Sequence, residues 1–110
     1  MATMEEKMVE YVAQLKELGV SVDEDMLAAV AKDLGPANYN LDASLVSCTD
    51  DEELERVYAN FVADELAVSD KEAGMAAIKE VCEQMGGVSR KHRAVFYYLL
   101  AKNLGTGKYA

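Results

Sequence analysis

Near its end the chain carries a run of four potential cations: Arg90, Lys91, His92 and Arg93. The run lies at the predicted start of the last helix, where the positive end of the helix dipole disfavours positive charge. Such bases can hold an external anion or an acidic partner, together with the free N–H groups of the helix start. They can also pair with carboxylates of the same chain, and the 20 acidic residues make this the favoured explanation. We expect Arg93 to be an internal clamp, because its planar guanidinium suits two-point binding of a carboxylate. We expect Arg90 and Lys91 to be exposed.

No other grouping of residues indicates catalysis, a cofactor or a metal. His92 is the single histidine, which rules out a multi-histidine metal site. The sequence has no Gly-x-Ser-x-Gly elbow, no phosphate-binding loop and no calcium loop. The acidic run at residues 50–55 suits the first turn of a helix, where each charge contributes ~0.3–1 kcal/mol, better than a metal site. We therefore predict no catalytic residue, no metal ligand and no cofactor, and we favour a protein without enzymatic activity.

The two cysteines, Cys48 and Cys82, match no zinc-binding spacing. A cytosolic protein with two cysteines normally keeps both reduced, so we predict two free thiols. Cys82 lies on an apolar helical stripe and is expected in the core. Cys48 lies in a polar loop and is expected to be the more reactive thiol. A nucleophile formed by either cysteine with His92 is conceivable, but no neighbouring residue supports it.

Charge is distributed unevenly along the chain, whose formal net charge is −9. All 20 acidic residues lie between Glu5 and Glu83, and with six bases they give the first 83 residues a net charge of −14. The last 27 residues contain five bases and no acid. This balance argues against general nucleic-acid binding, which depends on Lys and Arg. It also allows a basic face on one copy to meet an acidic face on another.

Apolar residues recur at helical spacing in five segments and predict helices over residues 4–18, 21–34, 49–66, 69–85 and 89–104. Capping boxes begin the second, third and fourth helices at Ser21, Thr49 and Ser69, and Ser89 can cap the fifth. We predict an all-α fold, a compact bundle of about five helices in a single domain, residues 1–105. The 37–49 connection has room for a short sixth helix around residues 43–46. Residues 106–110 are expected to form a frayed tail.

The same stripes define the expected core. Tyr97 and Tyr98 point about 100° apart on a helix, so one should flank the core and the other should approach the surface. The core is predicted to contain Tyr11, Leu15, Val30, Leu54, Val57, Phe61, Ile78, Val81, Phe96, Leu99 and Leu100.

The sequence contains no segment suited to a membrane. No apolar run approaches the ~18 residues needed to cross a bilayer. Residues 1–6 are acidic and lack the basic start and apolar run of a signal peptide. We expect a cytoplasmic protein with no membrane partner.

Two segments of the chain resemble a known family. The middle contains Leu34-Gly35-Pro36, then Tyr39-Asn40 with Asp42, then Leu45-Val46-Ser47. The basic cluster leads into Arg93-Ala94-Val95-Phe96-Tyr97-Tyr98-Leu99-Leu100. Both resemble a small bacterial family classified as domain of unknown function 2853, and the similarity runs from the first helix to Gly105. The resemblance implies a bacterial, cytoplasmic, helical protein, and it implies no activity and no functional residue.

Two kinds of function remain open from the sequence. The first is a helical interaction module without catalysis, which binds an unknown protein partner or associates with itself. The second is a small-ligand protein or enzyme that binds an anion at Arg90, Lys91, His92 and Arg93. Specific DNA binding ranks third, because the acidic remainder of the surface would repel phosphate.

Overall fold

The computed structural model describes residues 3–109, and this part of the chain folds into an all-α bundle. Its five α-helices are α1 (Met4–Glu17), α2 (Glu24–Leu34), α3 (Asp51–Val57), α4 (Lys71–Gln84) and α5 (Arg93–Leu104). Two short 3₁₀ helices follow α2 and α5: η1 (Gly35–Tyr39) and η3 (Gly107–Tyr109). The prediction of about five helices is confirmed. The short helix predicted around residues 43–46 is not formed, because residues 41–44 form a turn. The short helix near this connection is η1, which directly follows α2.

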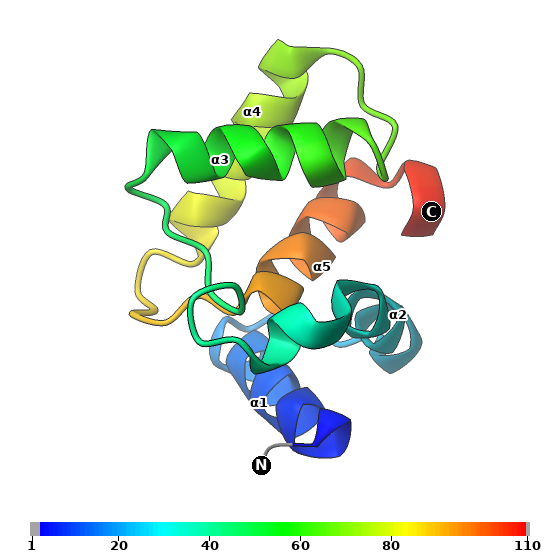
Figure 1. Cartoon of the computed structure of the whole chain (residues 1–110), viewed down its shortest axis with the longest axis vertical. Helices are drawn as coiled ribbons and strands as arrows, with labels where there is room; N and C mark the ends of the chain where they lie inside the picture. Colours follow the sequence, from blue (N-terminus) through cyan, green and yellow to red (C-terminus); the bar gives the residue numbers. More distant parts are fainter. Residues whose placement is uncertain (1–2, 110) are drawn as a thin grey trace.

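α5 is the central helix of the bundle (Figure 1), between α3 and α4 on one side and α1 and α2 on the other. Every residue from Ala94 to Ala101 is buried. The expectation that one adjacent tyrosine approaches the surface is therefore wrong, because Tyr97 is 7% exposed and Tyr98 is fully buried. A helix that packs on all sides has no outward face, so it needs no apolar stripe.

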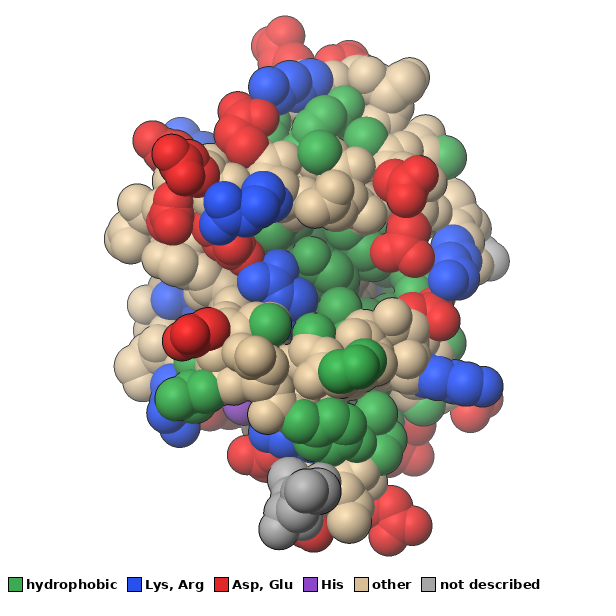
Figure 2. Space-filling model, in the orientation of Figure 1, with side chains coloured by type: hydrophobic (Ala, Val, Ile, Leu, Met, Phe, Trp, Pro, Cys, Tyr) green, Lys and Arg blue, Asp and Glu red, His purple; other side chains and the backbone are tan. Residues whose placement is uncertain are grey.

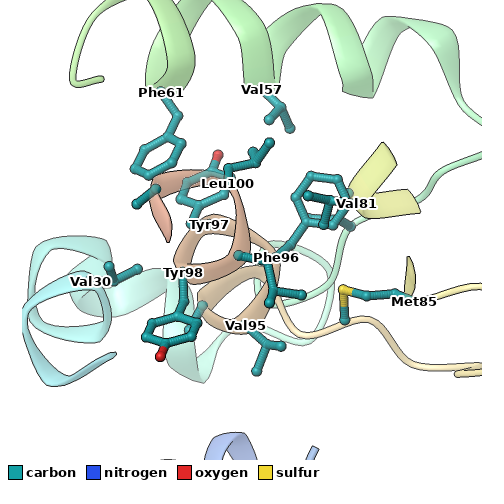
Figure 3. Packing of buried hydrophobic residues seen from close by; sticks show 14 of the residues in the cluster. Val30, Val57, Phe61, Val81, Met85, Val95, Phe96, Tyr97, Tyr98 and Leu100 are labelled. Atoms are coloured by element: carbon teal, nitrogen blue, oxygen red, sulfur yellow. The ribbon is translucent and has the colours of Figure 1, made fainter. Parts of the chain in front are cut away.

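The helix α3 continues without a break into a π-helical turn, η2 (Tyr58–Ala63), which brings aromatic side chains onto α5. The ring of Phe61 stacks on the ring of Tyr97 with centroids 3.9 Å apart. Figure 3 shows both rings between η2 and α5. Of the core residues predicted above, Leu54 alone is half-buried, and the others are buried.

Buried polar groups fix the connections to the core. The hydroxyl of Tyr11 donates to Asn38 Oδ1 at 2.7 Å, and Asn38 Nδ2 donates to the carbonyls of Ala31 and Gly35 at 2.7 and 2.9 Å. The hydroxyl of Tyr98 donates to the carbonyl of Ser21 at 3.0 Å. These bonds hold η1 and the α1–α2 turn in place, because breaking one would strand a buried polar group.

Three helices begin at an aspartate rather than at the serine or threonine that the sequence indicates. Asp23 accepts from the N–H of Met26 at 3.1 Å, and Asp50 and Asp70 cap α3 and α4 in the same way. The predicted caps at Ser21, Thr49 and Ser69 lie one or two residues too early. Aspartate caps a helix as well as serine does, and its charge also suits the helix dipole. The prediction for Ser89 is wrong too, since α5 starts at Arg93 with no side-chain cap.

The segment after α5 is docked on the bundle rather than frayed. Thr106 Oγ1 donates to the carbonyl of Leu66 at 2.9 Å, and the backbone N–H of Lys108 donates to the carbonyl of Glu65 at 3.0 Å. Gly107 has a φ of 75° and would place a Cβ 2.4 Å from the Leu66 Cα, so the close approach needs glycine. Residues 106–109 therefore belong to the fold, and Ala110 lies outside the described residues.

No helix within residues 3–109 combines the length and the apolar character that a bilayer span needs.

Candidate functional site

As predicted, Arg93 is an internal clamp, although it holds a carboxylate through one nitrogen and not through the expected two. Its Nη2 pairs with Glu53 of α3, and its Nη1 donates to the Tyr97 hydroxyl at 3.0 Å. Its Nε donates to the carbonyl of Ala43 at 2.6 Å, and Nη2 also donates to the carbonyl of Leu45 at 3.1 Å. One side chain thus joins α5, α3 and the 40–50 loop, and it is not available to an external ligand.

The carboxylate of Glu53 is held ionised by this arrangement. Burial disfavours its charge, but hydrogen bonds from Arg93 and Arg56 outweigh burial and keep the pKa of Glu53 below its usual value. Arg56 reaches the second carboxylate oxygen at 2.9 Å from the exposed side of α3. The sequence did not single out Glu53, which lies within the acidic run at the start of the third predicted helix.

The backbone of the 40–50 loop runs beside the start of α5. The N–H of Arg93 donates to the carbonyl of Ser44 at 2.7 Å, and the N–H of Val46 donates to the carbonyl of Lys91 at 2.9 Å. Leu45 and His92 form an isolated antiparallel β-bridge. These contacts span about half the chain, so residues 41–46 keep a defined shape without a helix of their own.

Arg90 and Lys91 lie on an open depression of about 740 Å³ between residues 41–50 and residues 89–91, here called the loop hollow. Arg90 is exposed, and among residues 3–109 no ion pair or hydrogen bond involves its side chain. Lys91 is half-buried, and its Nζ donates to the carbonyl of Val88 at 2.9 Å. Leu41, which is 67% exposed, lines the same hollow.

His92 faces away from this cation pair. Its half-buried ring lies edge-on to the ring of Tyr11, with centroids 5.2 Å apart. Its backbone N–H donates to Gln14 Oε1 at 3.2 Å, and Gln14 Nε2 donates to the carbonyl of Arg90 at 2.7 Å. Burial lowers the pKa of His92, which favours the neutral imidazole. The structure therefore does not assemble the four predicted residues into one cationic cluster.

The prediction of two free thiols is wrong, because Cys48 and Cys82 form a disulfide with Cα atoms 5.8 Å apart. The contacts of the 40–50 loop with Arg93 bring Cys48 across to the last turn of α4, where Cys82 lies. The two cysteines are 34 residues apart, and neither their spacing nor the expected cellular compartment indicates that they lie close together. Bonded to each other, the two sulfurs offer no nucleophile for a pair with His92.

Acidic and basic side chains are interspersed over the face of the molecule in Figure 2. Two of the C-terminal bases pair with acids from earlier in the chain, Arg93 with Glu53 and Lys108 with Asp33. The charge asymmetry along the sequence is thus partly neutralised inside one molecule. Arg90 and Lys91 are the C-terminal bases that line the loop hollow.

The chain matches the model of one protein family over residues 10–108, described as a protein of unknown function, DUF2853. The match covers most of the chain, so the chain belongs to this family. A comparison with curated proteins finds no match.

Proposed function

We propose that this member of the DUF2853 family is a small, cytoplasmic interaction module without catalysis, which binds a protein partner at the loop hollow. The observation that supports the proposal is the pairing, on one open surface, of a large exposed apolar side chain with a basic side chain that has no carboxylate partner within residues 3–109. These are Arg90 and Leu41. Protein interfaces combine apolar contacts with a polar rim in this way.

The chemistry of the hollow indicates the partner. Arg90 and Lys91 favour carboxylates, and Leu41 favours an apolar side chain that would cover it. Asp42 and Asp50 line the same hollow, so the partner segment must carry both acidic and polar groups rather than a dense negative charge. An acidic protein segment with one apolar anchor fits these requirements, and a second copy of this acidic chain is one source of it.

The shape of the hollow favours a protein over a small anion. It is open to solvent along its length, and Arg93 turns away from it to bind Glu53. Small-ligand sites are mostly concave and bury most of their ligand. The remaining bases, Arg90 and Lys91, place positive charge at the edge of the loop hollow and do not enclose a pocket.

Charge reversal tests the proposal directly. The double variant Arg90→Glu with Lys91→Glu is compared with wild type and with Lys16→Glu with Lys32→Glu. The control makes the same change in net charge at exposed positions away from the hollow. Partners captured from the native host are quantified by mass spectrometry for all three proteins. Light scattering after size-exclusion chromatography at low and high salt measures self-association.

A partner, or a dimer, that survives in the control and is lost in the Arg90/Lys91 variant supports the proposal. Equal capture by all three proteins, together with a monomer at both salt concentrations, contradicts it.

A further inference from the structure

The disulfide between Cys48 and Cys82 lies at the surface, between two depressions. Cys48 lines the loop hollow and also a smaller cavity of about 350 Å³ between α3 and α4. Cys82 lines the smaller cavity with the apolar side chains of Leu54, Met75 and Ile78. Both cysteines are half-buried. Exposed disulfides exchange with thiols more readily than enclosed ones, so the position of this disulfide favours thiol–disulfide exchange.

Hydrogen bonds, besides the disulfide, hold the loop that carries Cys48. Residues 43–46 are held by the side chain of Arg93 and by backbone bonds to Lys91 and Arg93. The bonds within residues 47–50 are local, such as the 3.3 Å contact between the hydroxyls of Ser47 and Thr49. The disulfide is therefore the link from this short segment to α4. Its cleavage would release residues 47–49 and leave the Arg93 anchor intact.

The charges around Cys48 select the kind of thiol that reaches it. The molecule as a whole carries a net charge of −9, so an anion is repelled over most of the surface. In the loop hollow, Arg90 and Lys91 offset Asp42 and Asp50. The carboxylate of Asp50 is also engaged, because it accepts from the N–H of Glu52 at 3.0 Å. An anionic thiol meets less repulsion here than over the acidic remainder.

We infer that the Cys48–Cys82 disulfide is a thiol-exchange site that takes an anionic low-molecular-weight thiol onto Cys48 from the loop hollow. The thiolate of the small molecule forms a bond to Cys48 Sγ, and the bond between the two protein sulfurs breaks. Its electron pair leaves with Cys82 Sγ, which takes a proton from water. A second small thiolate then attacks the small molecule's sulfur in the mixed disulfide and forms the oxidised small-molecule disulfide. The electron pair of the broken bond leaves with Cys48 Sγ, which takes a proton from water, so both cysteines end reduced.

The smaller cavity suits Cys82 as the leaving sulfur. Attack on a disulfide runs in line with the breaking bond, so entry from the hollow onto Cys48 directs the electron pair towards the α3–α4 cavity. Lys79 lies one turn before Cys82 on α4 and lines this cavity with Asp51. Its ammonium group offsets the negative charge of Asp51 in this cavity, so the departing thiolate meets less repulsion there.

The adduct would lie where the proposed partner binds, because Cys48 is part of the loop hollow. Thiol addition would then compete with the partner. This consequence rests on the proposed function, whereas the exchange chemistry does not. The experiment below measures the chemistry alone, so its failure is distinct from the failure of the binding proposal.

The test treats the native, oxidised protein with reduced glutathione, quenches it with acid and iodoacetamide, and maps the cysteine peptides by mass spectrometry. We expect a glutathione adduct on Cys48 and an alkylated Cys82 in the same molecules, at least about tenfold above the reverse arrangement. A sample unfolded in urea serves as the reference and should lose this preference, because the cavities no longer exist.

The charge selectivity is measured by comparing glutathione with the neutral thiol 2-mercaptoethanol. Electrostatic steering changes encounter rates by about tenfold or more. The variant Arg90→Glu with Lys91→Glu should therefore lower the glutathione rate several-fold relative to the neutral thiol. The matched reversal at Lys16 and Lys32 should leave that ratio unchanged. Three results would overturn the inference: a native disulfide inert to both thiols, an adduct mainly on Cys82, or an unchanged ratio in the Arg90/Lys91 variant.

Discussion

Replacement of Arg93 by methionine should destabilise the protein strongly, because one side chain satisfies four groups. The variant keeps the apolar stem of the side chain and removes the guanidinium. Glu53 then loses its main partner, although the exposed Arg56 remains beside it. The carbonyls of Ala43 and Leu45 lose their donors as well.

The expected magnitude follows from burial. The side chains of Arg93 and Glu53 are 15% and 14% exposed. Breaking a buried pair by removal of one partner costs about 3–5 kcal/mol. The remaining exposure and Arg56 place the pair near the lower end, and the two carbonyls add about 1 kcal/mol each. We therefore expect a loss of about 5 kcal/mol and a fall in Tm of roughly 20 °C for a domain of this size.

Urea unfolding followed by circular dichroism measures this loss, and Arg56→Met is the matched control. The pair of Arg56 with Glu53 is exposed on the arginine side, so its removal should cost only about 0–1 kcal/mol. The lowered pKa of Glu53 stabilises the fold above the unfolded value of 4.5, and this contribution is lost as pH falls through the folded pKa. The difference between wild type and Glu53→Gln should therefore shrink in acid. An Arg93→Met variant within about 1 kcal/mol of wild type at neutral pH would refute the clamp.

Three further predictions follow from other contacts. Cys82→Ser, or reduction of the disulfide that spans 34 residues, should lower the free energy of unfolding by about 4 kcal/mol in the chain-entropy account. Urea unfolding with and without dithiothreitol checks this, and no reductant effect should remain in the variant. Gly74→Ala should lower Tm in thermal melts, despite the better helix propensity of alanine, because its Cβ would lie 2.5 Å from Tyr58 Cε1 and overpack the α4–η2 contact. Burial lowers the pKa of His92 in the folded state, so stability should fall as pH drops below the unfolded value of 6.5. His92→Gln should flatten that slope in urea titrations between about pH 7 and 5.

Local periodicity was sufficient to predict the helices and most of the core. Apolar spacing placed Leu15, Phe61 and Val81 on inward faces, and all are buried. It failed for Tyr97 and Tyr98, because a stripe implies one buried face and α5 is surrounded. Periodicity also could not choose between neighbouring Ser, Thr and Asp caps, since each type satisfies a helix start.

The features of the candidate site that could not be predicted from the sequence are those formed by contacts between residues far apart in the chain. An internal role for Arg93 was predictable from the chemistry of guanidinium, but its partners, Glu53 on α3 and two carbonyls of the 40–50 loop, come from 40 to 50 residues earlier. The disulfide depends on the same loop, whose course is fixed by backbone bonds to residues 91–93. The spacing of the two cysteines along the chain does not reveal that they lie close together in the fold. The expected cytosolic location favoured two reduced thiols instead.

The central position of α5 also explains how part of the charge asymmetry of the sequence is neutralised within one molecule. The bases that flank a buried helix emerge at its two ends and meet different parts of the acidic segment. Arg93 meets Glu53, and Lys108 meets Asp33 and Glu65. Intramolecular ion pairs thus use two of the five C-terminal bases that could have attracted a partner. Arg90 and Lys91 are the C-terminal bases that line the loop hollow. Reversing the charge of these two residues therefore separates a binding role from a structural one.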